Sequence, residues 1–358
     1  MNRVRRPRKV LVLLSAAAVA LLAAFPVSFA HAQTIDPPVG NDGEYVESWA
    51  VSPVGEDPGE PSSRPNFSYR VAPGGTVEDA VTVWNYSPVP VQFRLFPTDA
   101  FNTDSGAWAL LKTGKAPKDL GAWITVASGA VTVPAESSVT VPITLQVPKD
   151  ASPGDHAAAV LAASNAVGTT DQGSQVNLER RTGPRVYLRV AGAVSPELTI
   201  ESMSSKYHGK FNPFDGELDV EWTVRNPGNV RMGATQRLVV KDIFGRTVKT
   251  QKVERIDELL PGNAATYRAT VSGVPATLRV KATVQVEPFG TSAIEGDTVP
   301  EPFSGTSTAW AIPWTLLLLL ALAYLCYRLY RRWRDREQEE EPPSGAVPPE
   351  RIPEPVGR

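Results

Sequence analysis

The segment Val77–Asp99, VEDAVTVWNYSPVPVQFRLFPTD, decides the fold of this chain. It contains two runs in which apolar and other residues alternate, joined by Asn85-Tyr86-Ser87-Pro88. A period of two is typical of a strand with one buried face, so the segment predicts two neighbouring antiparallel strands. The apolar face of such a sheet needs a second sheet to cover it, and the segment therefore predicts a β-sandwich.

The same plan occurs a second time further along the chain. Leu218–Arg225 alternates in the same way and is followed by the turn Asn226-Pro227-Gly228-Asn229. Short strands with turn residues between them are typical of the immunoglobulin-like fold. The sequence therefore predicts an all-β protein with two tandem immunoglobulin-like β-sandwich domains, at 67–194 and 195–290.

The first repeat is longer than the second between its turn asparagine and a later proline. The interval from Asn85 to Pro134 exceeds the interval from Asn226 to Pro261, and the surplus falls most naturally in Phe101–Leu120. An irregular segment added to a regular scaffold often carries function. We expect a binding surface there.

Composition excludes some classes of function. The 358 residues carry a formal net charge of -2, which gives no reason to expect a nucleic-acid partner. The single cysteine, Cys326, cannot form an intramolecular disulfide.

The N-terminus has the three parts of a secretory signal peptide. Five basic residues precede the apolar run Val10–Phe25, and Ala30-His31-Ala32 provides a small-x-small cleavage site. We expect export with cleavage after Ala32. The next segment, 33–66, is rich in proline, glycine and acidic residues, which predicts a linker that contains a possible first strand.

The C-terminal part predicts a membrane anchor. Ala309–Tyr327 is almost wholly apolar and long enough for about one bilayer crossing. Arginines follow at once, which places that side in the cytoplasm and the bulk of the chain outside the plasma membrane, in the cell-wall zone, as a single-pass type I protein. We expect a linker at 291–308, the helix at 309–327 and a disordered cytoplasmic tail at 328–358. The expected membrane-interface residues are Trp310, Trp314, Tyr327, Arg328, Arg331 and Arg332.

Catalytic and metal-ligating patterns are scarce in this sequence. Outside the predicted signal peptide only His156 and His208 remain, and they suggest neither a zinc cluster nor a nucleophile with its base. We expect no cofactor and no enzymatic activity. Asp99, Asn102 and Asp104 could hold calcium through oxygen ligands, although caps on a turn explain the same residues.

Aromatic residues near the first turn and in the surplus segment are the better candidates for recognition. Aromatic faces stack on sugar rings and anchor protein partners, although packing under a loop is an alternative for each ring. The candidate ligand-binding residues are Trp84, Asn85, Tyr86, Asp99, Asn102, Asp104 and Trp108.

An ordered series of motifs between Phe67 and Ser164 resembles the peptidoglycan-binding domain of WxL-interacting proteins, which are membrane-anchored surface proteins of Gram-positive bacteria. The matching motifs are Tyr69–Gly75, Val83–Ser87, Asp99–Thr103, Gly121–Ile124, and Val147-Pro148 followed by Pro153–His156. The resemblance implies an immunoglobulin-like, non-enzymatic scaffold or adhesin that contacts peptidoglycan or another wall glycan, with WxL-type or other surface proteins as further partners. In that family the second domain is assigned to a host or surface-protein partner. The second domain of this chain shows only a general sandwich pattern, so host binding is not expected of it on the resemblance.

Two functions are therefore expected. The first is a membrane-anchored cell-surface protein that binds peptidoglycan, other surface proteins, or both. The alternative is an accessory subunit of a membrane-bound envelope enzyme or secretion complex, which contacts its partner through the transmembrane helix and the Arg-rich tail.

Overall fold

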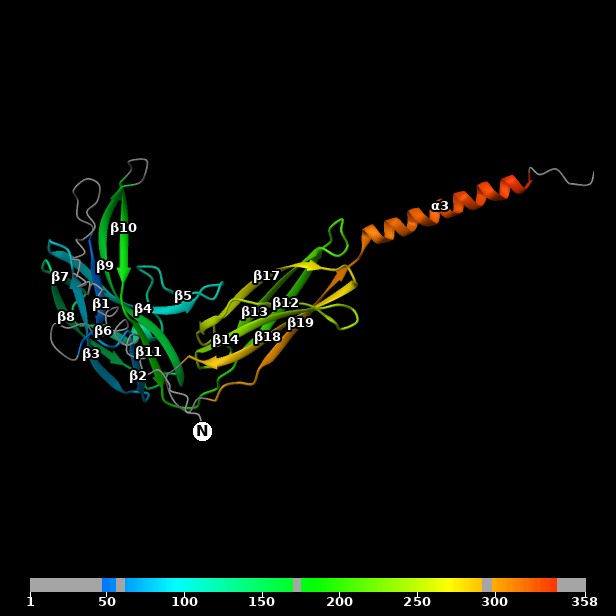
Figure 1. Ribbon diagram of the computed structural model, residues 1–358. Coiled ribbons are helices and arrows are strands. Elements are labelled where there is room, and N and C mark those ends of the chain that lie inside the picture. The colour runs from blue at the N-terminus through cyan, green and yellow to red at the C-terminus, as the bar shows by residue number, and fades with distance from the viewer. Residues whose placement is uncertain (1–46, 56–61, 170–174, 292–297, 340–358) are drawn as a thin grey trace, which may run out of the picture. The chain divides into compact units, whose positions relative to one another are not determined.

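The computed structural model describes residues 47–55, 62–169, 175–291 and 298–339, and β-strands dominate them (Figure 1). The predicted signal peptide, 1–32, and the first part of the predicted linker, to residue 46, lie outside these ranges. An apolar helix follows the strands near the C-terminus. The fold is thus mostly β, as the alternating runs predict.

Residues 49–190 form two sheets, which we call the N-terminal sheet pair. One sheet has the order β1-β3-β8-β6, and the other has the order β2-β11-β9-β4-β5 with β10 on β9 and β7 on β4. All pairings are antiparallel except β11 with β2. The bounds are β1 Trp49–Pro53, β2 Phe67–Val71, β3 Thr76–Asn85, β4 Val91–Asn102, β5 Trp108–Leu110, β6 Ile124–Val126, β7 Ala130–Val133, β8 Ser137–Gln146, β9 Gly154–Thr169, β10 Gln175–Thr182 and β11 Arg185–Val190, with the short helix α2 at Leu120–Trp123.

Residues 199–311 form two further sheets, which we call the C-terminal sheet pair. Their orders are β12-β13-β17 and β15-β14-β18-β19, with β16 on β14. The bounds are β12 Thr199–His208, β13 Gly216–Arg225, β14 Met232–Lys241, β15 Thr247–Lys252, β16 Ile256–Leu259, β17 Ala264–Val274, β18 Leu278–Gly290 and β19 Phe303–Ala311.

The strands on either side of Asn85-Tyr86-Ser87-Pro88 are not paired with each other, so this part of the prediction is wrong. β3 pairs with β1 and β8, whereas β4 pairs with β9, β7 and β5 in the other sheet. Val83 and Phe93 nevertheless share one core, since both are fully buried. The loop carries the chain from one sheet to the other, and the alternation reflects burial rather than pairing. β13 and β14 are related in the same way.

A buried asparagine holds each of these crossovers. Asn85 donates from its amide nitrogen to the carbonyl oxygens of Val89 at 2.8 Å and Pro134 at 3.0 Å. Asn226 does the same to Val230 at 2.7 Å and Leu259 at 2.9 Å. The side chains satisfy backbone carbonyls at the two crossovers, so the two turn asparagines stabilise the fold.

Each sheet pair has a core of its own. Most buried apolar side chains of the two N-terminal sheets belong to one cluster that extends from Phe67 to Val190. Those of the C-terminal sheets belong to another, from Leu198 to Ala311, centred on Trp222. Trp222 is fully buried, donates to Gln236 Oε1 at 2.7 Å and stacks on Tyr267.

The expected linker, 291–308, and the expected helix start at Ala309 are wrong. Residues Phe303–Ala311 form strand β19, which pairs with β18 from Val286 to Leu278. Small and polar residues dominate this strand, so its apolar alternation is weak in the sequence. The strand is nevertheless packed, because a Cβ at Gly305 would lie 2.8 Å from the Ile200 side chain.

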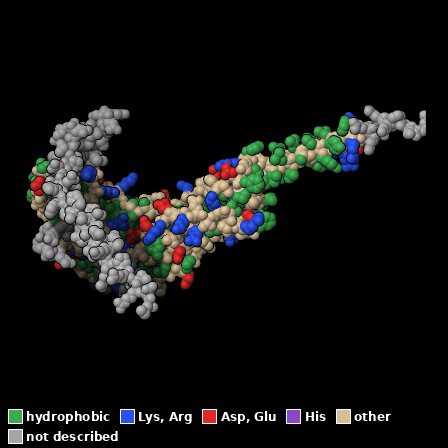
Figure 2. Space-filling view, in the orientation of Figure 1, with side chains coloured by type: hydrophobic (Ala, Val, Ile, Leu, Met, Phe, Trp, Pro, Cys, Tyr) green, Lys and Arg blue, Asp and Glu red, His purple; other side chains and the backbone are tan. Residues whose placement is uncertain are grey.

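Helix α3, Trp314–Glu339, is long and apolar enough to cross a membrane. Within Trp314–Arg336 a stretch of 18 residues has a mean hydropathy of 1.2, and exposed leucines lie along it, which Figure 2 shows as hydrophobic side chains. The helix includes residues 328–339, which the sequence assigned to a disordered tail; residues 340–358 lie outside the described ranges. Trp310 belongs to β19, whereas Trp314, Tyr327, Arg328, Arg331 and Arg332 belong to α3.

The Trp222→Ala variant tests the importance of the second core. We expect the free energy of unfolding to fall by about 3–5 kcal/mol, because the substitution opens a cavity and removes the donor to Gln236. Denaturant unfolding of the detergent-solubilised chain measures this change. Trp310→Ala is the matched control, since this ring is 69% exposed, and its effect should stay within about 0.5 kcal/mol. Equal effects would contradict the assignment of Trp222 to the core.

Candidate functional site

The surplus segment Phe101–Leu120 helps to join the two sheet pairs. Its first part is a hairpin between β4 and β5, closed by Gly106 at a φ of +85°, which favours glycine. Gly106 lies against Tyr267 of β17, because a Cβ there would be 2.5 Å from Tyr267 Oη. The Thr266 N–H donates to the Asp104 carbonyl at 2.7 Å. The tip of the hairpin is therefore bound to the C-terminal sheet pair.

Asn102 extends this contact from the last residue of β4. Its amide nitrogen donates to the Glu258 carbonyl at 2.8 Å and to the Gly106 carbonyl at 3.1 Å. Its Oδ1 accepts from the Leu260 N–H at 2.8 Å, and its own N–H donates to Asn263 Oδ1 at 3.2 Å. One buried side chain thus pairs backbone groups of both sheet pairs.

A buried ion pair lies at the same junction. Arg189 donates to both carboxylate oxygens of Asp155, from Nη2 at 2.9 Å and also from Nε, and both side chains are about 95% buried. Asp155 Oδ2 also accepts the backbone N–H of Arg231 at 3.0 Å. The Asp155 N–H donates to the Asn229 carbonyl at 2.7 Å. The carboxylate is therefore shared between β11 and the start of β14.

Asn229 completes the junction from the C-terminal side. Its amide nitrogen donates to the carbonyls of Pro153 at 2.8 Å and Ala193 at 2.9 Å, and its Oδ1 accepts the Ser195 N–H at 2.7 Å. Gly154 has a φ of +123°, and a Cβ there would lie 2.2 Å from the Asn229 carbonyl oxygen. Only glycine allows this close approach.

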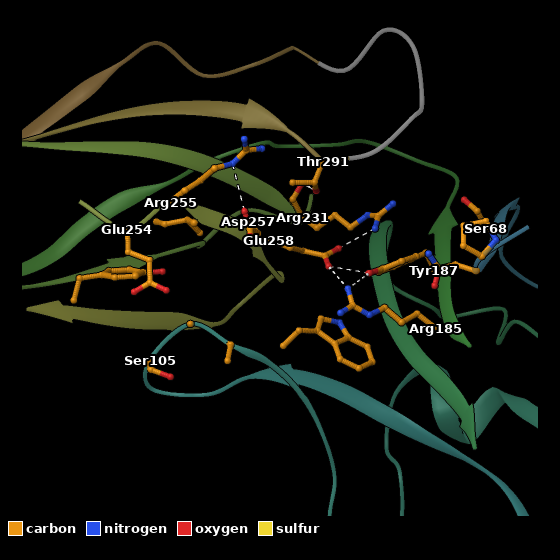
Figure 3. Close-up of a pocket in the computed structure, with 17 residues that line it drawn as sticks. Ser68, Ser105, Arg185, Tyr187, Arg231, Glu254, Arg255, Asp257, Glu258 and Thr291 are labelled. Carbon is orange, nitrogen blue, oxygen red and sulfur yellow. Dashed lines mark hydrogen bonds and ion pairs between the residues drawn. The ribbon is translucent and has the colours of Figure 1, made fainter. Parts of the chain in front are cut away.

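Glu258 is the centre of a polar network on one side of the junction (Figure 3). It accepts from Arg231 Nη1 at 2.8 Å and from Tyr187 Oη at 2.8 Å, and Arg185 Nη1 lies 3.4 Å away. The Arg185 guanidinium stacks over the Trp108 ring at 4.2 Å, and that of Arg231 over the Tyr187 ring at 3.8 Å. Burial and the charge of Glu258 raise the pKa of Tyr187, so its hydroxyl stays a neutral donor.

This network forms one wall of a pocket of about 860 Å³ lined by residues of both sheet pairs. The lining combines guanidinium, carboxylate, hydroxyl and aromatic groups, the kinds of group that bind polar ligands with rings and charges. Arg185 is 43% exposed, and Arg255 lies 3.4 Å from Asp257 (Figure 3). The lining residues that carry this chemistry are Ser68, Ser105, Trp108, Arg185, Tyr187, Arg231, Glu254, Arg255, Asp257, Glu258, Tyr267 and Thr291.

The structure divides the candidate ligand-binding residues between opposite ends of β4. Trp84, Asn85 and Tyr86 precede this twelve-residue strand, and Asn102 ends it. At about 3.3 Å per residue the two ends are more than 30 Å apart. Asn85 is buried, Trp84 donates to Ser52 Oγ at 3.2 Å, and Tyr86 is half exposed. Trp84 and Tyr86 therefore share no patch with Trp108.

The candidates at the other end of β4 lie in or beside the junction. Asn102 and Asp104 bind the C-terminal sheet pair, and Trp108 lines the pocket. Asp99 accepts the backbone N–H groups of Lys118 at 2.6 Å, Asp119 at 3.0 Å and Gly121 at 2.7 Å. Asp99 therefore holds the second half of the surplus segment. Of the two roles expected for it, calcium ligand and turn cap, this is the turn cap. No group of three metal-ligating side chains occurs among the described residues.

Sequence reasoning missed the charged lining of the pocket. Arg185, Tyr187 and Arg189 follow one another on the same face of β11, and this alternation was visible. Arg185 and Tyr187 line the pocket, and their partners Arg231 and Glu258 belong to the C-terminal sheet pair, further along the chain. Contacts between residues more than forty positions apart have no signal in a single sequence.

His156 forms a second polar group beside the junction. Its Nδ1 donates to Asp119 at 2.7 Å, its Nε2 lies 3.0 Å from the Ser152 carbonyl, and its ring packs against Trp123. Both ring nitrogens face acceptors, which favours the imidazolium. Burial opposes this charge, but the hydrogen bond and charge of Asp119 outweigh it and raise the pKa of His156.

Comparisons with known proteins concern the fold. No protein-family model matches the chain, and no curated protein matches its sequence. Solved structures similar to the chain include the class 5 fimbriae chaperone CfaA (11% identity, TM-score 0.37, 73% of this chain and 99% of that one). Others are the Pseudomonas aeruginosa CupB2 chaperone (12%, 0.30, 70% and 99%) and the CsuC–CsuE complex of Acinetobacter baumannii (9%, 0.35, 73% and 99%). All three TM-scores are below 0.5, so the function proposed below is argued from this chain's own residues.

The Asp155→Ala variant tests the buried ion pair. We expect the free energy of unfolding to fall by about 3–5 kcal/mol, because the buried Arg189 guanidinium loses its two bonds to the Asp155 carboxylate. Denaturant unfolding measures the change. Asp257→Ala is the control: its side chain is 90% exposed, so its effect should stay within about 0.5 kcal/mol. A change of similar size in both variants would show that Asp155 does not stabilise the junction.

The pH dependence of stability tests His156. Its folded-state pKa lies above the unfolded value of about 6.5, so its contribution is fully present below about pH 6.5 and is lost as the pH rises through the folded pKa. The difference in unfolding free energy between the natural chain and Asp119→Asn should therefore be constant below about pH 6.5 and shrink as the pH rises above that value. His208→Gln is the control, since His208 and Asp219 form an exposed pair. A difference that is constant with pH would contradict this role.

Proposed function

We propose that the chain is a non-enzymatic, membrane-anchored cell-surface protein of two tandem immunoglobulin-like β-sandwich domains that binds cell-wall peptidoglycan in the junction pocket. The observation that carries the proposal is the pocket itself, because its guanidinium, aromatic and hydroxyl groups come from both sheet pairs. The candidate membrane helix α3 supports the anchor.

The chemistry of the pocket suits a wall polymer. Peptidoglycan presents sugar hydroxyls, apolar ring faces and the carboxylates of its lactyl and peptide groups. Arg185 and Arg255 offer guanidinium donors for carboxylates, and Glu254 and Asp257 offer acceptors for hydroxyls. Tyr267 adds an aromatic ring to the lining.

The orientation of the chain follows from its charges. Arg328, Arg331 and Arg332 cluster in the C-terminal half of α3, which by the positive-inside rule lies on the cytoplasmic side. With a cleaved signal peptide this gives type I topology, and both sheet pairs lie outside the membrane. Surface proteins of the WxL type are further candidate partners, on the resemblance of Phe67–Ser164 alone.

Co-sedimentation with purified peptidoglycan tests the proposal. The detergent-solubilised full chain should sediment with the polymer at low salt, and Arg185→Gln combined with Arg255→Gln should weaken binding about tenfold through the loss of charge-assisted hydrogen bonds. Arg268→Gln is the control, since this arginine of β17 is 76% exposed and pairs with Glu221 away from the pocket.

Two results would contradict the proposal. The full chain could stay in the supernatant at low salt, or the pocket variant could bind as well as the control. In either case, co-purification of a membrane partner that is lost when 314–327 is replaced by an unrelated apolar helix would favour the accessory-subunit function.

A further inference from the structure

Three loops of the C-terminal sheet pair lie at the end of the sheets from which the chain enters α3. The loops are 209–215, 242–246 and 275–277. Their flanking strands pair at this end, Gly216 with Val274 and Leu278 with Ala311, the last residue of β19. We call these loops, with Leu278 and Trp310, the helix-proximal end. The opposite end of the same sheets forms the junction.

Large apolar side chains are exposed at the helix-proximal end. Phe211 is 90% exposed, Phe214 is 74% exposed, Phe244 is 76% exposed and Trp310 is 69% exposed. Exposed apolar side chains are common one at a time, but several gathered on one end mark a contact surface. Figure 2 shows hydrophobic side chains at the end of the C-terminal sheet pair that leads into α3.

Cations accompany the exposed rings. The Arg246 guanidinium lies 5.2 Å from the centre of the Phe244 ring, and that of Arg279 lies 6.0 Å from the centre of the Trp310 ring. Lys281, next to them on β18, is also exposed. Rings beside Arg and Lys are typical of surfaces that lie in the headgroup layer of a membrane, where phosphates meet acyl chains.

The connection to α3 is short. Only Ile312 and Pro313 separate β19 from the helix, and the helix begins at once, since the Leu317 N–H donates to the Pro313 carbonyl at 3.0 Å. Two residues span at most about 10 Å, including the bonds that join them to their neighbours. The first residue of α3, Trp314, is itself an exposed aromatic of the interfacial type.

We propose that the helix-proximal end docks on the outer surface of the membrane that α3 crosses, with Phe211, Phe214 and Phe244 in the headgroup layer. The partner is the lipid bilayer, and Arg246 and Arg279 contact its phosphates. This inference rests on the membrane anchor of the proposed function but does not depend on peptidoglycan binding.

Quenching by lipid tests the docking. A fluorophore is attached at Ile243→Cys in a Cys326→Ser background, and the full chain is reconstituted in phosphatidylcholine–phosphatidylglycerol vesicles that contain lipids with a headgroup spin label. We expect quenching at residue 243 and none at Asp257→Cys, an exposed position at the junction end. In a chain that also carries Phe211→Ser and Phe214→Ser, quenching at 243 should fall at least about threefold, because the apolar contact is lost.

Matched variants separate docking from tethering. Phe211→Leu with Phe214→Leu should keep the quenching, since the apolar surface is retained. The proposal is wrong if the Ser variant is quenched like the natural chain, because the short link alone then explains proximity. It is also wrong if position 243 is quenched no more than position 257.

Extraction with alkaline carbonate distinguishes the two proposals. If the natural chain is extracted from the vesicles, the membrane anchor fails, and the docking fails with it. If the chain resists extraction and residue 243 is not quenched, only the docking fails.

Discussion

The burial of the Asp155 carboxylate is the constraint on which the arrangement of this protein depends. A carboxylate without solvent must be compensated, and Asp155 receives the Arg189 guanidinium from its own sheet pair and the Arg231 N–H from the next. Since the compensation comes from both sides, the two sheet pairs are coupled at this point. Asn102 and Asn229 add hydrogen bonds between neutral groups of the two sheet pairs. The Glu258 network beside them lines the pocket.

The strands could be predicted from the sequence because their alternation reports burial directly. β13 and β14 were visible in this way, and so was the apolar C-terminal helix, although it begins at Trp314 rather than Ala309. The pairing of strands could not be predicted, because alternation gives the buried face and says nothing about the neighbour. β3 and β4 contribute to the same core but are not hydrogen-bonded to each other. A turn asparagine is compatible both with a hairpin and with a crossover between sheets. β19 was not predicted because glycine, serine and threonine occupy most of its positions, so the sequence shows no clear apolar alternation.

Only part of the candidate site could be predicted from the sequence. Comparison of the two repeats located the surplus segment, and the structure places Asn102, Asp104 and Trp108 of that segment in the junction or its pocket. The turn residues Asn85 and Asn226 have the same structural task in both repeats, so their similarity reflects folding. The charged lining depends on contacts between Tyr187 and Glu258, which only the folded chain brings together.

The position of β19 has a mechanical consequence. The chain enters the C-terminal sheet pair at the start of β12, at the junction end, and leaves it at Ala311, at the opposite end. A tensile load between the first sheet pair and α3 would therefore act along the strands. The β18–β19 ladder runs from Val286 to Leu278, and its hydrogen bonds would be sheared together rather than opened one after another. This geometry resists extension of the C-terminal sheet pair along its strands.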